Sequence, residues 1–447
     1  MRIIIIGAGK LGYSIAELLS KEEYDIVVVD QDAGRLEIVK ETLDVMTMEA
    51  NGSSPITMDD PEIRDSDVLI AVTANDEVNM VSCILAKKHG IKHTVARIRD
   101  MQFISEAKEY LKSNFDIDLM LNPEMLTAME INRILMVPAA LNVEDFADGK
   151  VRLFETKVKS ESSLIHIPLK DLDIPKDILA AMIFRGHQLI IPHGNDCLMP
   201  FDNVYFVGAP QSIESFSKNL IQQNSSRVRN VMIIGAGRTG RFLAYSLDKM
   251  GVNVKVVDKD RHVCRQISEK LDRGSAIHGD GTNIDLLIEE GITEADAVAC
   301  LTKDDNLNLL MALLCKHMGA KKTIVHVARS EYIDLMEKVG IDVVLSSRFL
   351  AASEILTYVR KGGIVSVSLL EGAKAEAMEL IVQENSPVAG KKLMNAGLPR
   401  ECLVCGHVRD DIASIPRGDT LLEPNDRIIL LVDKNHSKRV LPYFKAN

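Results

Sequence analysis

The same glycine loop occurs twice in this 447-residue chain. An apolar run at residues 3–6 continues as GAGKLG at 7–12, and an apolar run at 231–234 continues as GAGRTG at 235–240. In a parallel α/β unit, the first glycine of such a loop permits a tight turn from strand to helix. The second lets the backbone approach a phosphate, and the third lets the helix pack on the strand. A chain with two such loops is expected to contain two similar α/β units.

Further short Val/Ile-rich runs follow each loop in the same order. Residues 25–30 (DIVVVD) and 67–73 (DVLIAVT) correspond to 253–258 (NVKVVD) and 296–302 (DAVACLT). Short continuous apolar runs that alternate with helical patterns indicate parallel strands covered by helices on both faces. We predict an α/β protein with two Rossmann-like, doubly wound parallel-sheet domains.

Each predicted sheet domain is followed by a shorter segment of alternating strands and polar turns. The turn sequences IIPHGND (190–196) and SIPRGDT (414–420) match, so this second module is also duplicated. A polar stretch at 217–229 separates the two halves. The predicted organisation is a Rossmann nucleotide-binding domain at 1–135, a small α+β domain at 136–220, a second Rossmann nucleotide-binding domain at 228–358 and a second small α+β domain at 359–447.

Composition excludes several classes of protein. The chain is 46% hydrophobic and 26% charged, which is typical of a folded globular protein. Aromatic residues make up 4%, Trp is absent and the formal net charge is −11, which argues against a nucleic-acid-binding protein. No apolar run reaches the roughly 18 residues of a membrane span. The seven scattered cysteines suit a reducing compartment, so we expect a cytoplasmic protein.

An acidic residue stands 18 positions beyond the last glycine of each loop. Asp30 and Asp258 each close an apolar run. A carboxylate at this place accepts hydrogen bonds from both ribose hydroxyls and repels a 2′-phosphate, which favours NAD(H), ATP or ADP over NADP(H). The candidate cofactor-binding residues are Gly7, Ala8, Gly9, Lys10, Leu11, Gly12 and Asp30 in the first copy, and Gly235, Ala236, Gly237, Arg238, Thr239, Gly240 and Asp258 in the second. Lys10 and Arg238 either lean over the phosphates or belong to a solvated helix face.

A second shared pattern, T-x-x-D-x-x-N, begins at Thr73 and at Thr302. It lies at the predicted carboxyl end of the fourth strand, on the edge where ligands bind in open parallel sheets. Asn79 and Asn308, which end the pattern, are candidate ligand contacts. The alternative is an ordinary helix start, in which polar side chains cap free N–H groups.

The two copies differ after the third strand. The second copy has GDGT at 279–282, and the first has NGSS at 51–54 in the aligned place. If Asp280 binds the adenine edge or holds this turn, the first copy lacks an equivalent carboxylate. We therefore expect the two sites to differ in affinity or in ligand.

No catalytic group and no metal site are predicted. A nicotinamide dehydrogenase needs a substrate domain and a proton donor or acceptor placed at the hydride. The small domains are short and rich in turns, and their histidines do not recur as a pair across the repeat. Nucleotide sites without chemistry suit a sensor, in which a ligand shifts the population of conformations. An NAD-dependent oxidoreductase is the alternative.

The chain also resembles a known family. The motifs VTANDEVN (72–79) and VARIRD (95–100) in the first half, with GDGTN (279–283) and LTKDDNLN (301–308) in the second, are similar to those of the TrkA family. Its members are peripheral subunits of Trk potassium-uptake systems and carry tandem regulator-of-potassium-conductance (RCK) units. The resemblance covers essentially the whole chain. It implies further nucleotide contacts at Thr73, Ala74, Arg97 and Ile98 in the first half, and at Thr302, Lys303, Ala328 and Arg329 in the second.

The resemblance also implies a function and an assembly. It implies a cytoplasmic regulatory subunit that gates a membrane potassium-uptake transporter in response to NAD(H), ATP or ADP. Such a subunit is a homo-oligomer, a dimer or tetramer, held at the inner face of the membrane by a TrkH- or TrkG-like translocator. The helix at 122–135 is then expected to be exchanged between neighbouring Rossmann domains; the alternative is that it packs on its own sheet. A regulator of another cation channel or antiporter is the alternative.

Overall fold

The computed structural model describes residues 1–446 apart from 23, 101–102, 104–114, 138–139, 163, 187, 221–227, 361–363, 371–373 and 400. The predicted linker at 217–229 therefore lies partly outside the described residues. The chain forms two compact units, Met1–Thr127 with Ser346–Val359, and Ala128–Leu345 with Arg360–Asn447. Each unit thus combines segments that are far apart in the sequence.

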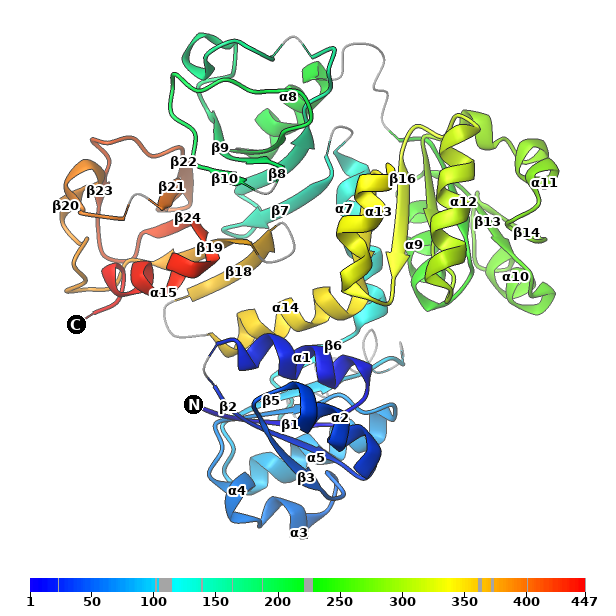
Figure 1. The fold of residues 1–447 in the computed structure, drawn as a ribbon, viewed down its shortest axis with the longest axis vertical. Helices are drawn as coiled ribbons and strands as arrows, with labels where there is room; N and C mark the ends of the chain where they lie inside the picture. The colour runs from blue at the N-terminus through cyan, green and yellow to red at the C-terminus, as the bar shows by residue number, and fades with distance from the viewer. Residues whose placement is uncertain are drawn as a thin grey trace. The chain divides into compact units, whose positions relative to one another are not determined.

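The first unit contains a six-stranded sheet in the order β3-β2-β1-β4-β5-β6, in which all pairings are parallel. Central strand β1 buries Ile3, Ile4 and Ile5 completely, because helices cover both faces of a doubly wound sheet (Figure 1). The predicted Rossmann-like fold class is confirmed. The elements of this sheet are β1 (Arg2–Ile6), α1 (Lys10–Ser20), β2 (Asp25–Asp30), α2 (Ala33–Thr42), β3 (Met46–Glu49), α3 (Pro55–Met58), α4 (Pro61–Arg64), β4 (Val68–Ala71), α5 (Asp76–Lys88), β5 (His93–Arg97) and β6 (Leu119–Leu121).

The second unit contains a matching sheet in the order β14-β13-β12-β15-β16-β17. Its central strand β12 pairs in parallel with both neighbours, Val231 with Val254 and with Ala297. The elements of this sheet are β12 (Asn230–Ile234), α9 (Arg238–Lys249), β13 (Asn253–Asp258), α10 (Arg261–Ser268), β14 (Ser275–His278), α11 (Ile284–Glu289), β15 (Ala297–Cys300), α12 (Asp305–His317), β16 (Thr323–Val327), α13 (Ile333–Val339) and β17 (Val343–Ser346). The internal repeat in the sequence thus corresponds to two parallel sheets with the same strand order.

The helix that follows the last strand of each parallel sheet packs in the unit that holds the other parallel sheet. Helix α7 (Pro123–Met136) follows β6, but its residues Ile131 and Leu135 are buried in one core with Val254 of the second sheet. Helix α14 (Ser347–Val359) follows β17 and packs against α1 in the first unit (Figure 1). The helix exchange expected between neighbouring Rossmann domains therefore occurs within one chain.

The two small domains are antiparallel five-stranded sheets with equivalent orders, β10-β9-β11-β8-β7 and β22-β21-β24-β19-β18. They share one core, to which Phe146 and Tyr205 contribute from the first domain and Leu370 and Ile429 from the second. The elements of the two domains are β7 (Asn142–Phe146), β8 (Val151–Lys157), β9 (Ile178–Arg185), β10 (Gln188–Ile190), β11 (Asn203–Gly208) and α8 (Pro210–Leu220), then β18 (Ile364–Leu370), β19 (Ala375–Ile381), β20 (Lys391–Lys392), β21 (Cys402–Arg409), β22 (Ile412–Ser414), β23 (Leu421–Leu422), β24 (Arg427–Asp433) and α15 (Ser437–Val440).

A buried aspartate also recurs six positions after the matching turn sequence of each small domain. Asp202 accepts hydrogen bonds from Arg185 Nε and Nη2 at 2.9 and 2.8 Å. Asp426 is held in the same way by Arg409, at 2.8 and 2.7 Å. Bidentate pairing to a planar guanidinium fixes the aspartate and therefore the turn that carries it. The repeated turn is a structural device of the small domains.

The buried end of α7 predicts an unusual pH dependence of stability. Glu130 Oε2 lies 3.2 Å from Arg133 Nη1, which also donates to Glu144 Oε2 at 2.9 Å. Burial, together with the charges of Glu144 and Asp145, raises the pKa of Glu130 to about 8. Because the unfolded pKa is about 4.3, the folded state binds this proton more tightly. The stabilisation is present below the unfolded pKa and is lost as pH rises through 8.

We expect the unfolding free energy of the parent chain to fall by on the order of 3 kcal/mol between pH 5 and pH 8. Glu130→Gln, which keeps the neutral shape, should flatten this slope. Urea unfolding at several pH values measures both chains. Glu269→Gln serves as a control at an exposed carboxylate of the same unit, which is paired with Arg265 and is not among the groups that shift the pKa of Glu130. Equal slopes in the parent and Glu130→Gln would show that Glu130 does not carry the effect.

Candidate functional site

The first glycine of each loop adopts a backbone conformation that other residues rarely tolerate. Gly7 has φ +108° and Gly235 has φ +105°. Each also lies against the end of the fourth strand, since a Cβ would come within 3.1 Å of Thr73 N at Gly7 and within 2.9 Å of Thr302 N at Gly235. Both loops therefore turn sharply at the same place, next to the carboxyl ends of β4 and β15.

The second and third glycines of each loop have different surroundings. The second borders open space, and the third is in contact with the backbone of its own loop. A Cβ at Gly12 would lie 1.8 Å from Gly7 O, and one at Gly240 would lie 2.1 Å from Gly235 O. The third glycine thus allows the helix to touch its own loop. A Cβ at Gly9 would meet nothing within 4 Å, so the second glycine borders an open approach to the backbone.

The two helices that follow these loops begin without a side-chain cap. Their N-cap residues are Gly9 and Gly237, and neither helix has a side-chain hydrogen bond at this end. Helices α2, α5, α10 and α12 are capped by Asp32, Asn75, Asp260 and Asp304. Uncapped N–H groups at the positive end of the helix dipole are suited to bind an anion such as a phosphate. Lys10 and Arg238, the first residues of the two helices, are exposed beside these N–H groups.

The predicted ribose acids are tied to the glycine loops. Asp30 Oδ2 accepts a hydrogen bond from Ala8 N at 2.6 Å, and Asp258 Oδ2 accepts one from Ala236 N at 2.6 Å. The second oxygen of Asp30 accepts from Asp32 N at 3.0 Å. A carboxylate has about four acceptor positions, so each acid retains capacity for ribose hydroxyls. The loop and the acid are therefore one preformed unit.

The candidates Asn79 and Asn308 hold the strand ends and do not present a free polar group. Asn79 Oδ1 accepts from Thr73 N and Oγ1 at 2.9 and 2.7 Å, and its Nδ2 donates to Arg97 O at 2.8 Å. Asn308 makes the same bonds to Thr302 and to His326 O. Both side chains are 0% exposed. This geometry corrects the expectation of ligand contact: these residues position Thr73 and Thr302.

Replacing Asn79 with Ala is expected to lower the unfolding free energy by about 2–3 kcal/mol, because it leaves the Thr73 amide and the Arg97 carbonyl without their partner. Urea unfolding measures the loss. Asn75→Ala is the matched control, since Asn75 only caps α5 through Val78 N at 2.8 Å and should cost about 1 kcal/mol. Equal losses in the two variants would contradict the positioning role.

The same bonds correct the alignment after the fifth strand. Asn79 reaches Arg97 O, whereas Asn308 reaches His326 O, so His326 is the counterpart of Arg97. Ala328 N donates to Asp305 as Arg99 N donates to Asp76, which makes Ala328 and Arg329 the counterparts of Arg99 and Asp100. The residues that correspond to Arg97 and Ile98 in the second copy are therefore His326 and Val327, two positions before the expected contacts Ala328 and Arg329. His326 was missed, although the one-residue offset at Thr302 would have located it.

The remaining candidates lie around the same edge. Arg97 Nη2 lies 3.6 Å from Glu124 Oε1 at the start of α7. Ile98 is fully buried and its side chain belongs to the core. Ala74 and Lys303 are exposed at the rim. Leu11 and Thr239 are buried in the first turns of α1 and α9. At this edge of the sheet, exposed residues thus lie above buried side chains of the core.

Both copies form the same turn after the third strand. This turn corrects the alignment of GDGT at 279–282 with NGSS at 51–54. Ala50 N donates to Asp30 O at 3.0 Å and Gly279 N donates to Asp258 O at 2.9 Å. Asn51 is therefore the counterpart of Asp280, and GDGT corresponds to ANGS at 50–53. The first copy does have an equivalent polar residue. It is an amide where the second copy has a carboxylate.

Asp280 is ionised within this turn. Its Oδ1 accepts from Thr282 N and Oγ1 at 2.9 and 2.7 Å, and its Oδ2 lies 3.1 Å from Lys259 Nζ. The Thr282 hydrogen bonds and the Lys259 ammonium lower the pKa of Asp280. The second copy therefore carries a charged carboxylate at this place near neutral pH.

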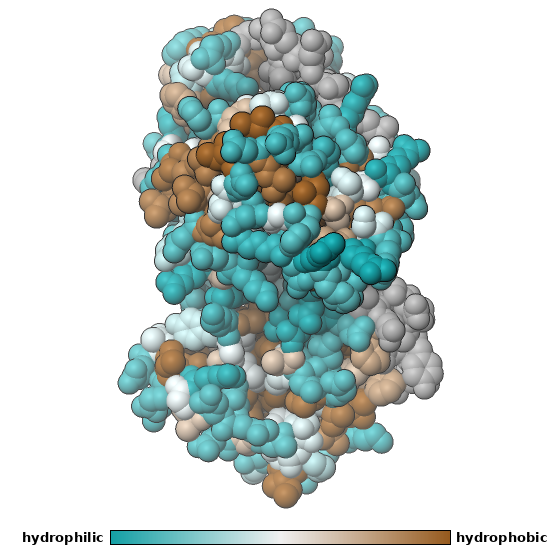
Figure 2. Space-filling view, turned by 90° about the vertical axis from the view of Figure 1, so that its right-hand side faces the viewer, coloured by the Kyte–Doolittle hydropathy of each residue, from teal (hydrophilic) through white to brown (hydrophobic). Residues whose placement is uncertain are grey.

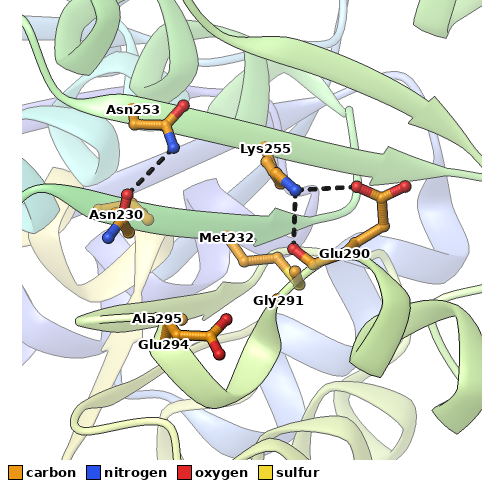
Figure 3. Close-up of a pocket in the computed structure, with 9 residues that line it drawn as sticks. Asn230, Met232, Asn253, Lys255, Glu290, Gly291, Glu294 and Ala295 are labelled. Atoms are coloured by element: carbon orange, nitrogen blue, oxygen red, sulfur yellow. Dashed lines mark hydrogen bonds and ion pairs between the residues drawn. The ribbon is translucent and has the colours of Figure 1, made fainter.

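A cavity of about 220 Å³ lies at the opposite edge of the second sheet (Figure 3). It is lined by Asn230 and Asn253 at the amino ends of their strands and by Lys255, whose Nζ donates to Glu290 O and Oε2 at 2.9 and 3.0 Å. Ligands of open parallel sheets bind outside the carboxyl ends of the strands. This cavity is therefore not the nucleotide site.

Comparisons with known proteins point to one family. The TrkA-N domain model matches residues 3–123 and 231–347, and the TrkA-C domain model matches 153–221 and 377–445. The chain is 35% identical to "Trk system potassium uptake protein TrkA homolog 1" of Methanosarcina mazei, over 100% of both chains. It is also 35% identical to "Trk system potassium uptake protein TrkA" of Halomonas elongata, over 100% of this chain and 99% of that protein.

A solved structure described as "GsuK channel bound to NAD" has a similar fold. The TM-score is 0.63 at 17% identity, and the match covers 99% of this chain and 78% of that chain. At this identity the likeness concerns the fold alone.

Proposed function

This chain belongs to the TrkA family, and from that premise we propose that it is a regulatory subunit that gates a membrane potassium-uptake transporter when NAD(H), ATP or ADP binds its two Rossmann domains. The observation that carries the proposal is the pairing, in both halves, of an uncapped helix N-terminus with an acid fixed to the same loop. The N–H groups would take the phosphates and the acid would take the ribose. A ligand that prefers one conformation would then shift the population of the subunit.

The proposed nucleotide contacts follow from this geometry. The loops at 7–12 and 235–240 would hold the phosphates, with Lys10 and Arg238 at their rim. Asp30 and Asp258 would hold the ribose. Residues at the carboxyl ends of the fourth and fifth strands would border the far end of the ligand, namely Thr73, Ala74, Arg97 and Ile98 in the first site and Thr302, Lys303 and His326 in the second. No residue is assigned a catalytic role.

We further propose that the subunit acts as a homo-oligomer and docks on a TrkH- or TrkG-like membrane protein. Apolar side chains gather on the surface of the second sheet domain (Figure 2). Leu310 on α12, with Leu335 and Val339 on α13, are exposed large apolar residues there. Exposed apolar patches of this kind mark protein–protein interfaces, which supports self-association through these helices. Among the described residues, no helix is both long and apolar enough to cross a bilayer.

The test is potassium flux into proteoliposomes that contain the translocator and this subunit, with NADH, NAD, ATP or ADP added in turn. We expect flux to change with at least one nucleotide, and the change to disappear when both sites carry Asp at Gly9 and Gly237. Steady oxidation of NADH in the presence of a keto or imino substrate would instead favour an oxidoreductase. Nucleotide binding without any effect on flux would favour a regulator of another cation channel or antiporter.

A further inference from the structure

The base of a bound nucleotide would reach the turn after the third strand. The phosphates would lie at the end of β1 and the ribose at the end of β2, so the base continues in the direction of β3. Asp30 pairs with Glu49 of β3, and Asp258 pairs with His278 of β14. The turns that contain Asn51 and Asp280 begin directly after these pairs. This step rests on the nucleotide binding proposed above.

The two turns make the same hydrogen bonds and rest on the corresponding isoleucine of the central strand. In each, one side-chain oxygen accepts the N–H and the hydroxyl of the residue two positions later, Ser53 at 3.0 and 2.9 Å and Thr282 at 2.9 and 2.7 Å. A Cβ at Gly52 would lie 2.1 Å from Ile6, and one at Gly281 would lie 2.4 Å from Ile234. Both turns therefore sit close to the central strand, and the second polar atom of the Asn51 or Asp280 side chain differs in chemistry between them.

That atom is a donor in the first site and an acceptor in the second. A backbone N–H can only donate, so the atom of Asn51 that receives Ser53 N must be the amide oxygen. The remaining polar atom of Asn51 is therefore its Nδ2 donor. The corresponding atom of Asp280 is Oδ2, a charged acceptor paired with Lys259 Nζ at 3.1 Å. Lys259 is 64% exposed along its side chain, and an exposed ion pair contributes little, so a base can replace it.

The 6-position of a purine distinguishes these two atoms. Adenine carries an amino group there, which donates, whereas guanine carries a carbonyl oxygen, which accepts. With the 6-position facing the turn, an acceptor such as Asp280 matches the amino group of adenine and repels O6 of guanine. A donor such as Asn51 Nδ2 matches guanine O6, and it can also bond to a ring nitrogen of adenine. We propose that the second site selects adenine nucleotides, whereas the first site accepts guanine and adenine nucleotides alike.

The test measures each site separately by calorimetric titration with ATP and GTP. Gly237→Asp disables the second site and leaves the first, and Gly9→Asp does the reverse. We expect ATP and GTP to bind the first site within about threefold of each other, and the second site to prefer ATP by about tenfold or more. Asn51→Asp should give the first site the adenine preference, and Asp280→Asn should remove it from the second.

Equal rejection of GTP by both sites, or an Asn51→Asp variant whose ATP-to-GTP ratio is unchanged, would overturn the assignment while leaving nucleotide regulation intact. If neither ATP nor GTP binds either single-site chain, this inference falls. The proposed function falls with it only if NADH, NAD and ADP also fail to bind the parent chain.

Discussion

Replacing Gly9 with Asp should abolish nucleotide binding at the first site without loss of folded stability. Gly9 has φ −68° and ψ −179°, which any residue can adopt at an N-cap, and a Cβ there meets nothing within 4 Å. The new carboxylate would cap the free N–H groups of α1 and repel a phosphate. We expect affinity to fall at least about 100-fold, since like charges about 4 Å apart near a protein surface repel by several kcal/mol.

The folded state should gain a few tenths of a kcal/mol from the new cap. Titration calorimetry and urea unfolding measure the two effects on the same preparation. Gly9→Asn is the matched control, because it caps the helix without a charge and should retain more of the affinity than Gly9→Asp. Unchanged binding by Gly9→Asp would remove the N-terminus of α1 from the site. Gly237→Asp makes the equivalent test on the second site.

Replacing Gly12 with Ala should have the opposite profile, with a large loss of stability and loss of binding together. The added Cβ would lie 1.8 Å from Gly7 O, a backbone atom that cannot rotate away. Helix α1 would have to move off its loop, and overpacking of this kind costs about 3 kcal/mol or more. Nucleotide affinity at the first site should fall as well, because the loop and the helix N-terminus shift relative to each other.

Gly34→Ala is the matched control for this prediction. Gly34 is also helical, but a Cβ there meets only Asp32 Oδ1, at 3.3 Å. That variant should be neutral or stabilised by up to about 1 kcal/mol, because Ala is the better helix former. Thermal and urea unfolding compare the two chains. If Gly12→Ala unfolds at the same urea concentration as Gly34→Ala, close helix–loop packing is not the reason for the third glycine.

Much of the site could be predicted because its parts are close in sequence. The glycine loop and its acid lie within one strand–helix–strand segment, so fixed spacing from Gly7 to Asp30 already implies their meeting. The structure adds that the two are joined, through the bond from Ala8 N to Asp30 Oδ2 at 2.6 Å. The short continuous apolar runs that occur in both copies likewise predicted both parallel sheets, because strands of such sheets are buried on two faces.

The errors have a common cause, which is that a side chain's role depends on what packs against it. Asn79 has the residue type and position of a ligand contact, yet all of its bonding capacity is used by β4 and β5. Asn51 was aligned one residue away from its true partner, because an insertion between the copies is invisible until β3 is paired with β2. His326 is different, because the offset between Thr73 and Thr302 is visible in the sequence and would have located it.

The sequence by itself determined the two parallel-sheet units, the two glycine loops, the acids that follow them and the family, since each rests on local spacing, on motifs or on the alternation of apolar runs. Only the tertiary structure decided that α7 and α14 are exchanged between the two halves of the chain. The apolar face of a helix does not show which of the two sheets will bury it. Hydrophobic burial is non-directional, and either sheet offers a suitable surface. The choice is made by the chain connections and by the fit of side chains in the folded core.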